Sequence, residues 1–153
     1  MLTGEYRNTI DEKGRILIPA KLRSSLDGQG SLIITRAVES CLWIMLPPFF
    51  ENIRTKIMDG PGAMFDANLR LLQRRIIAPA MEVEIDKAGR LLIPPQLRES
   101  VGLTLKQESI LLGISTYMEL WSVDSYQQFL TDSEVSFNAA SQSLSILLQE
   151  GGH

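Results

Sequence analysis

The sequence contains the same segment twice. IDEKGRILIPAKLRSSL at residues 10–26 returns as IDKAGRLLIPPQLRESV at residues 85–101, and ten of the 17 aligned positions are identical. Unrelated segments of ordinary composition would share roughly one such position. The similarity continues downstream, where SLIIT at 31–35 resembles SILLG at 109–113 and an LW pair follows in each half. The chain therefore consists of two copies of one unit of about 45 residues, joined by a linking segment.

Each copy begins with a pattern typical of a half-buried strand that runs into a turn. The alternation of apolar and polar residues at 5–10 and 81–85 predicts one strand in each copy. A glycine follows where a hairpin turn would need a positive φ, and an apolar return strand is expected at 16–18 and at 91–93. The expected inward-facing residues are Tyr6, Asn8 and Ile10 in the first copy and Met81, Val83 and Ile85 in the second.

The rest of each copy predicts a short helix and two more strands. Pro19 and Pro94 stop the return strands and can open a helix, and the second helix should end at Gly102. Apolar runs then predict strands at 31–36 and 41–46 in the first copy, and at 109–114 and 117–122 in the second. One such unit is too small to bury a stable core alone, so we expect the two to close on each other as a pseudo-twofold barrel.

Helices are expected outside the two copies. Residues 47–79 look like two helices separated by 59–62, and a further amphipathic helix is expected at 135–148. We therefore divide the chain into a first unit (1–46), linking helices (47–79), a second unit (80–123) and a C-terminal helical segment (124–153). The expected apolar stripes are Phe65, Leu69, Leu72 and Ile76 in the linker and Phe137, Ala140, Leu144 and Leu147 in the C-terminal helix.

The charge is distributed unevenly along the chain. The net charge is −3, but residues 107–153 hold six acids and no Lys or Arg. Residues 1–106 carry all 15 Lys and Arg against the other 12 acids, a local balance of +3. This distribution is compatible with a basic working face and an acidic tail. No apolar run approaches the roughly 20 residues that would span a bilayer, so we expect a cytoplasmic protein without a membrane partner.

Several residues have an ordinary structural interpretation. Cys41 lies in the apolar run CLWIML and is expected to be a small buried hydrophobe rather than a reactive thiol. Trp43 and Trp121 occupy predicted strands and are expected in the core rather than stacked on bases. Arg74 and Arg75 are expected on a solvated face or at a subunit contact. The chain offers no nucleophile and base pair, no metal cluster and no glycine-rich phosphate loop, so neither an enzyme nor a cofactor or metal site is expected.

The repeated segments resemble a known family. DEKGRILIPAKLR and DKAGRLLIPPQLRESVGL, with the flanking GEYRNTIDEKGR and RRIIAPAMEVEIDKAGR, are similar to the paired Asp-x-x-x-Arg signatures of MraZ proteins in the AbrB-like swapped-hairpin superfamily. The resemblance implies a mainly β, α+β fold in which two tandem swapped-hairpin units form one pseudo-twofold, double-psi-like β-barrel with accessory helices. It also implies a cytoplasmic, nucleoid-associated regulator that binds short direct repeats in promoter DNA of the division and cell-wall gene cluster. The family forms ring-shaped homo-oligomers, so an octamer or a similar ring is expected.

The resemblance also assigns roles to individual residues. It places Arg15 and Arg90 against DNA, with Asp11, Gly14, Asp86 and Gly89 shaping the turns. The matching positions for phosphate contacts are Lys13, Lys21, Arg23, Lys87 and Arg98. The second copy departs from the first because Ala88 and Gln96 replace Lys13 and Lys21, so the first copy is the more basic of the two.

Physical chemistry agrees with a DNA-reading role but does not require it. A two-stranded ribbon fits the major groove of B-DNA, and an arginine at the start of the return strand could bind a guanine edge through two hydrogen bonds. The aspartates could hold these arginines at a defined angle before binding. Asp-x-x-x-Arg could instead be only an exposed ion pair, although its duplication argues against this. The sequence is also compatible with an antitoxin-like or transition-state regulator of the same superfamily, and with an interaction module that acts through the acidic tail.

Overall fold

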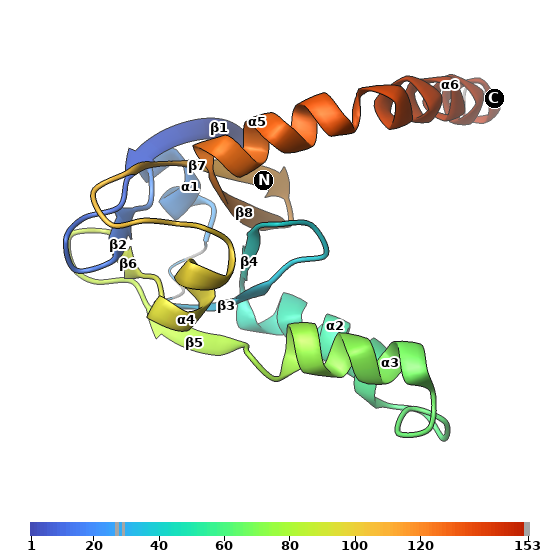
Figure 1. Ribbon diagram of the computed structural model, residues 1–153, viewed down its shortest axis with the longest axis horizontal. Coiled ribbons are helices and arrows are strands. Elements are labelled where there is room, and N and C mark those ends of the chain that lie inside the picture. The colour runs from blue at the N-terminus through green and yellow to red at the C-terminus, as the bar shows by residue number, and fades with distance from the viewer. Residues whose placement is uncertain (27, 29, 152–153) are drawn as a thin grey trace.

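The two copies of the repeat exchange their strands. The computed structural model describes residues 1–26, 28 and 30–151 (Figure 1). Strand β1 (Leu2–Thr9) of the first copy pairs antiparallel along its whole length with β7 (Glu108–Ser115) of the second. Reciprocally, β5 (Met81–Glu84) of the second copy pairs with β3 (Ser31–Arg36) of the first. Each copy thus places its first strand beside the third strand of the other.

These two strand pairs form the opposite ends of one antiparallel sheet with a pseudo-twofold order. The predicted hairpins form, since β3 pairs with β4 (Leu42–Met45) and β7 pairs with β8 (Tyr117–Ser122). The central contact is β4 against β8, and the six strands run in the order β1-β7-β8-β4-β3-β5. If each strand is replaced by its equivalent in the other copy, the same order is obtained, read from the other end. The repeat in the sequence is therefore also a symmetry of the fold.

The return strands form a separate ribbon. β2 (Arg15–Leu17) pairs antiparallel with β6 (Arg90–Leu92). The expected turns form, since Asp11 N donates to Arg15 O and Asp86 N donates to Arg90 O, and Ile85 makes an antiparallel bridge with Leu91. The expected hairpins are only partly confirmed, because the return strands pair with each other rather than with the strands before them. Both return strands lie one residue earlier than expected. The physical reason is the shared core: Ile16 faces Leu91 in the ribbon register, and both side chains are fully buried. Pairing across the copies buries apolar surface that one unit of this length could not cover alone.

Both copies contribute to the main hydrophobic core. It contains Ile10, Ile16 and Ile18 of the first copy and Leu91 and Ile93 of the second, packed with strand residues from the larger sheet. The predicted alternation holds for β1, where Ile10 is buried and Tyr6 and Asn8 are half-buried. It fails at Met81, which is half exposed, because β5 is an edge strand that begins at this residue.

Short helices follow the ribbon strands as predicted. α1 (Ala20–Ser24) follows Pro19, and α4 (Pro95–Ser100) follows Pro94. Each buries one leucine, Leu22 or Leu97, in the main core. Beyond α4 the chain turns at Gly102, which has a φ of 72°, as is common where a helix ends. The helices thereby hold the basic side chains of both copies beside the ribbon.

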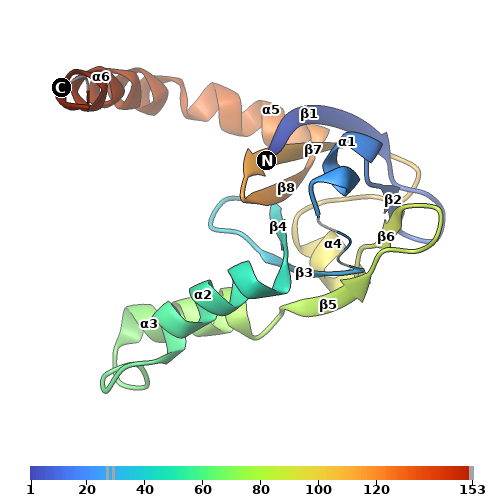
Figure 2. The ribbon, with the colours of Figure 1, turned by 180° about the vertical axis from the view of Figure 1, so that it is seen from behind.

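The linking segment forms a helical hairpin that projects from the body formed by the two sheets (Figures 1 and 2). It consists of α2 (Pro47–Met58), α3 (Ala67–Leu72) and the π-helical turn η1 (Gln73–Ile77). The predicted stripe is partly wrong, because Phe65 and Leu72 are exposed while Ile76 is buried. Phe65 precedes the helix, and the wide turn of η1 shifts the facing side chains by about one residue.

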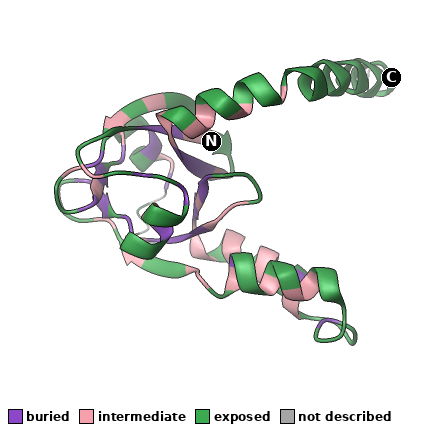
Figure 3. Ribbon diagram, viewed as in Figure 1, coloured by how far each residue is buried: buried purple, intermediate pink, exposed green. Residues whose placement is uncertain are grey.

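The C-terminal segment leaves the body in another direction. α5 (Val123–Asp132) packs on the sheet through Tyr126 and Phe129, whose rings lie 5.4 and 5.1 Å from that of Trp121. α6 (Glu134–Glu150) confirms the predicted helix, but every one of its residues is exposed (Figure 3). Its apolar stripe is therefore uncovered in the single chain.

The expectations for the lone thiol and the two indoles are largely confirmed. Cys41 is fully buried, and burial raises the pKa of its thiol, so the group stays neutral. Trp121 is 2% exposed and belongs to the second core cluster with Cys41 and Ile110. Trp43 is only partly buried and packs edge-on against Tyr117. Both aromatic side chains thus serve packing between strands and helices.

Candidate nucleic-acid interface

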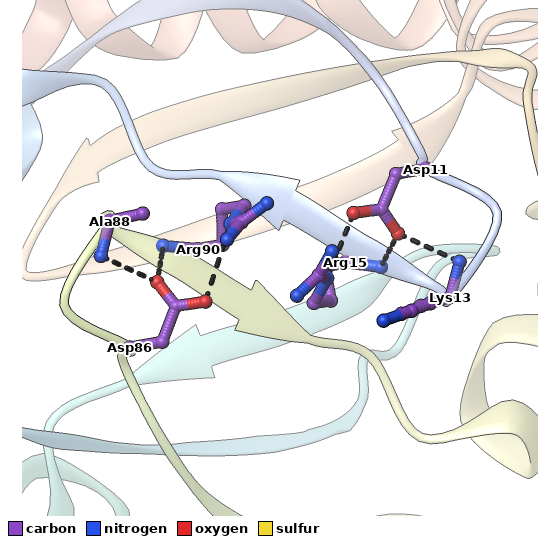
Figure 4. Close-up of polar contacts among 6 residues, drawn as sticks. All are labelled: Asp11, Lys13, Arg15, Asp86, Ala88 and Arg90. Carbon is purple, nitrogen blue, oxygen red and sulfur yellow. Dashed lines mark hydrogen bonds and ion pairs between the residues drawn. The ribbon is translucent and has the colours of Figure 1, made fainter.

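The β2–β6 ribbon brings the two Asp-x-x-x-Arg motifs onto one surface. Figure 4 shows Asp11, which precedes the turn into β2, beside Arg15 at the start of β2, and Asp86 beside Arg90 at the start of β6. Arg15 lies opposite Leu92 and Arg90 lies opposite Leu17, so both arginines occupy the outer face of the ribbon. Their side chains are 26% and 40% exposed. The antiparallel pairing therefore presents two guanidinium groups from segments far apart in the sequence.

Asp11 organises the first turn. Its Oδ1 accepts hydrogen bonds from the backbone N–H groups of Lys13 and Arg15, both at 2.9 Å, and its Oδ2 accepts one from Arg15 Nε at 2.9 Å. The backbone O of Asp11 also accepts from Gly14 N at 3.0 Å, which closes the turn. The carboxylate thus caps the turn and orients the arginine at the same time, as aspartate commonly does in turns.

Asp86 repeats this arrangement in the second copy. Its Oδ1 accepts from the backbone N–H groups of Ala88 at 2.9 Å and Arg90 at 2.8 Å. Arg90 Nε lies 3.3 Å from Asp86 Oδ2, so this ion pair is looser than the first. The two backbone hydrogen bonds are therefore repeated, while the hydrogen bond to the arginine Nε is made in the first copy and is replaced by a longer ion pair in the second. In both copies the aspartate contacts the Nε edge of its arginine and not the terminal Nη edge.

Both carboxyl groups are held in their charged form. The backbone N–H of Arg15 is the main group that lowers the pKa of Asp11, followed by the Arg15 side chain and the Lys13 N–H. The backbone N–H of Arg90 does the same for the pKa of Asp86, and the charge of Arg15 adds a smaller effect across the ribbon. The two motifs are therefore electrostatically linked, and both stay ionised at neutral pH.

The turns of the two copies lock onto each other. Gly14 O accepts from Ile93 N, and Gly89 O accepts from Ile18 N, both at 2.9 Å. The two glycines have φ values of 84° and 82°, as predicted from their place in the turns. A Cβ at Gly89 would overlap the guanidinium group of Arg23, and one at Gly14 would lie 3.6 Å from Arg98 Nε. Arg23 and Arg98 therefore each pack over the turn of the other copy.

The remaining predicted cations lie around this ribbon with different degrees of exposure. Lys13 and Lys87 sit in the turns, and Lys21 lies on α1. All three are exposed, as is Arg23, whereas Arg98 is half-buried. The structure thus brings Lys13, Arg15, Lys87 and Arg90 onto the ribbon and its turns, while Lys21 stands on the neighbouring helix.

Two features of the ribbon were not predicted. Asn8 Nδ2 donates a 2.7 Å hydrogen bond to the backbone O of Leu17, which ties β1 to the ribbon. Leu17 and Leu92 stand on the outer face beside the arginines and are 48% and 45% exposed. Their position two residues along the strand from each arginine is the signal that could have identified them, since side chains of a strand alternate between its faces.

The main hollows of the described chain are lined by residues outside the ribbon. An open hollow of about 670 Å³ between Gly102 and α5 is lined by Thr104, Gln107, Glu108 and Asp124 among others. Within residues 1–26, 28 and 30–151, no three His, Cys, Asp or Glu side chains converge to hold a metal ion. The helices of this same part of the chain are all too short or too polar to cross a membrane.

The chain is similar in sequence to known proteins over nearly its whole length. Residues 1–70 and 76–145 match the model of a family described as "MraZ protein, putative antitoxin-like". The chain is similar to the transcriptional regulator MraZ of Treponema denticola, with 44% identity over 94% of this chain and 96% of that protein. It is also similar to the transcriptional regulator MraZ of Thermoanaerobacter pseudethanolicus, with 37% identity over 94% of this chain and 96% of that one.

A solved structure shows a weaker likeness. The solution structure of PHS018 from Pyrococcus horikoshii aligns with a TM-score of 0.36 and 14% identity, over 76% of this chain and 95% of that one. The sequence relationship is much stronger, since it extends over both copies of the repeat and over the linking helices. On that relationship, the chain belongs to the MraZ family.

Proposed function

We propose that the chain is a DNA-binding transcription regulator, and not an enzyme, whose β2–β6 ribbon enters the major groove of promoter DNA. The relatives are named transcriptional regulators, and DNA is the partner that such proteins address. The observation that carries the proposal is the paired presentation of Arg15 and Arg90 on one partly exposed ribbon face. Neither a metal nor a cofactor is part of this function.

The arginines are prepared for base reading. Each aspartate contacts its arginine at Nε. The two terminal nitrogens of each guanidinium group are therefore left to face a ligand. Those nitrogens match the O6 and N7 acceptors that guanine presents in the major groove, and such a pair discriminates by about 1–3 kcal/mol against a wrong base. The carboxylates keep the guanidinium groups in place before binding, so less side-chain freedom is lost in the complex.

The surrounding cations supply the part of the affinity that does not depend on sequence. Lys13 and Lys87 in the turns and Lys21 on α1 are exposed beside the ribbon. We assign these three lysines to phosphate contacts. Arg23 and Arg98 join them through the guanidinium nitrogens that do not pack against the turn of the other copy. Because phosphate contacts release counterions, this share of the binding must weaken steeply with salt.

A ring-shaped homo-oligomer, an octamer or a similar ring, completes the proposal. One ribbon buries little surface on DNA, so short direct repeats would be held weakly by a single chain. Linked copies bind repeats with a raised effective concentration. The uncovered faces of α6 and of the helical hairpin support self-association, since Val135, Phe137, Phe65 and Met64 are all more than 60% exposed. Affinity should then rise steeply with the number of repeats.

The remaining assignments belong to the same proposal. The edge strands β1 and β5 each continue through a turn into the β2–β6 ribbon, which supports a pseudo-twofold, double-psi-like barrel around the core. We keep the division into units 1–46 and 80–123, linking helices 47–79 and C-terminal segment 124–153. The target is the promoter of the division and cell-wall gene cluster, and the location is the cytoplasm, on the nucleoid.

The test is a binding titration on a duplex from the region upstream of the chain's own gene, at two salt concentrations. Four proteins are compared: wild type, Arg15→Ala/Arg90→Ala, Arg15→Lys/Arg90→Lys, and a control with the same charge change, Arg7→Ala/Lys56→Ala. Arg7 and Lys56 are exposed and lie on β1 and α2, away from the ribbon. The alanine pair should lose the specific complex and keep only salt-sensitive binding.

The lysine pair separates charge from geometry. Lysine keeps the positive charge but lacks the planar fork of arginine, so this variant should keep the salt-sensitive affinity and lose part of its preference for the specific duplex. The control should resemble wild type. Unchanged specific binding by both arginine variants would refute the ribbon as the DNA-contacting surface.

A further inference from the structure

The outer face of the ribbon carries apolar side chains as well as arginines. In the register of β2 and β6, Arg15 lies opposite Leu92 and Leu17 lies opposite Arg90. The four side chains form a square in which the arginines occupy one diagonal and the leucines the other. Leu17 and Leu92 are 48% and 45% exposed, whereas Ile16 and Leu91 on the inner face are fully buried.

The exposed leucines are equivalent positions of the repeat. Residue 17 and residue 92 are both leucine, while the buried position between the arginine and the leucine differs, as Ile16 in one copy and Leu91 in the other. A single exposed leucine needs no explanation. Here two exposed leucines occupy symmetry-related positions on one ribbon, beside the arginines proposed to read DNA. They place apolar surface on the face that would enter the polar groove of DNA.

The spacing of the square matches that of stacked bases. Neighbours on one face of a strand are about 6.8 Å apart, and directly opposite Cβ atoms are about 5 Å apart. Base pairs are stacked about 3.4 Å apart. Each leucine therefore lies within about two base steps of the bases that the two arginines would reach, and all four side chains would meet one short run of base pairs.

We propose that Leu17 and Leu92 are specificity-determining residues that contact the C5-methyl groups of thymines next to the guanines bound by Arg15 and Arg90. This inference rests on the proposed function. The thymine methyl is the apolar group that base edges present in the major groove, and cytosine lacks it at the same position. An apolar side chain there favours thymine without any hydrogen bond, so the duplex recognised must place thymine close to guanine.

The test removes the methyl group and the side chain separately. The probes are the duplex from upstream of the chain's own gene, and the same duplex in which single thymines are replaced in turn by deoxyuridine, which differs only by that methyl. Wild type should lose roughly fourfold in affinity at each contacted thymine, the effect of one buried methyl group. The Leu17→Ala/Leu92→Ala protein should bind the parent duplex and each singly substituted duplex equally, with about the affinity of wild type for a duplex in which both contacted thymines are replaced.

A matched control is available on α5. Leu130 is 48% exposed, as Leu17 is, and Leu130→Ala should keep the full preference for thymine. The wild-type comparison between thymine and deoxyuridine needs no variant, so a folding defect in the leucine pair cannot obscure the result. Thermal unfolding of the leucine pair, whose side chains are half exposed, should match wild type.

The outcomes distinguish this inference from the proposed function. If wild type binds the duplex through Arg15 and Arg90 but ignores every deoxyuridine substitution, the leucine contact is overturned and the DNA-binding proposal stands. If the leucine pair keeps the wild-type thymine preference, another group reads the methyl and the inference is overturned as well. If wild type shows no specific binding to the duplex, both fall together.

Discussion

The guanidinium group of Arg23, in the first copy of the repeat, occupies the space where a Cβ of Gly89 in the second copy would lie. Arg98 and Gly14 form the reciprocal contact, in which Arg98 Nε lies 3.6 Å from the place that a Cβ of Gly14 would take. Arg23 on α1 and Arg98 on α4 therefore each lie against a glycine more than 60 positions away in the chain. This contact couples the turn that shapes one motif to the helix that follows the other.

Gly89→Ala should destabilise the protein by about 1–2 kcal/mol, because an alanine pays the cost of a left-handed backbone and also displaces Arg23. Urea unfolding measures the effect. Gly62→Ala is the control, since Gly62 has open space around it and is not in the left-handed region. In the double variant Gly89→Ala/Arg23→Ala, the stability lost through the overlap with Arg23 should return, and the stability lost through the left-handed backbone should not. Equal stability of Gly89→Ala and Gly62→Ala would contradict this account.

Asp11→Asn should make stability less sensitive to acid. The pKa of Asp11 is lower in the folded than in the unfolded protein, mainly through the Arg15 N–H. Its stabilising contribution is therefore present above the unfolded value, about 3.9, and is lost as the pH falls through the folded one. Unfolding midpoints at several pH values below about 5 should fall less steeply for the variant. The exposed neighbour provides the control, Glu12→Gln, and a variant slope equal to that of wild type would rule the idea out.

Glu119→Gln should change stability at high pH, whereas Asp11→Asn changes it at low pH. Glu119 is 9% exposed, lies opposite Trp43 in the sheet and accepts a 3.0 Å hydrogen bond from Trp121 Nε1. Burial raises its pKa, so its contribution is greatest below the unfolded value and is lost as the pH rises through the folded value. Glutamine keeps an acceptor for Trp121 without a charge. At pH values above the raised pKa of Glu119 the variant should be more stable than wild type, whereas Glu84→Gln on an exposed strand position should not be.

Trp121→Ala should cost about 3–5 kcal/mol and loosen α5 from the sheet, because the indole is buried and packs on Tyr126 and Phe129. Urea unfolding and amide hydrogen exchange along 123–132 report the two effects. Trp43→Ala, at a partly exposed position, should cost less and leave exchange in α5 unchanged. If both variants lose similar stability and show similar exchange in α5, the indole of Trp121 does not hold α5 on the sheet.

Leu144→Ser/Leu147→Ser/Leu148→Ser should reduce self-association without lowering the stability of the single chain. All three leucines lie on α6 and are more than 50% exposed, so nothing within the chain is lost with them. Sedimentation equilibrium measures the assembly, and unfolding of the dissociated protein measures the chain. Ser141→Ala/Ser143→Ala/Ser145→Ala is the control on the same helix. An assembly of unchanged size would exclude α6 as the contact between copies.

The sequence by itself determined the features that depend on neighbouring residues. The repeat, the positive φ of Gly14 and Gly89, the hairpins formed by β3 with β4 and by β7 with β8, and the existence of the helices follow from local chemistry. A turn needs a residue tolerant of its backbone, and an apolar run of given period needs one buried face. The family relationship also rests on these local segments, and comparison confirms it.

Only the tertiary structure decided which strands pair. Local patterns favour β2 beside β1 as much as β2 beside β6, and the choice depends on how much apolar surface the two copies bury together. That pairing places Arg15 opposite Leu92 and sets Arg23 over Gly89. The exposure of α6 is likewise visible only in the tertiary structure. The energy of a shared core is a property of the whole chain, and no stretch of sequence contains it.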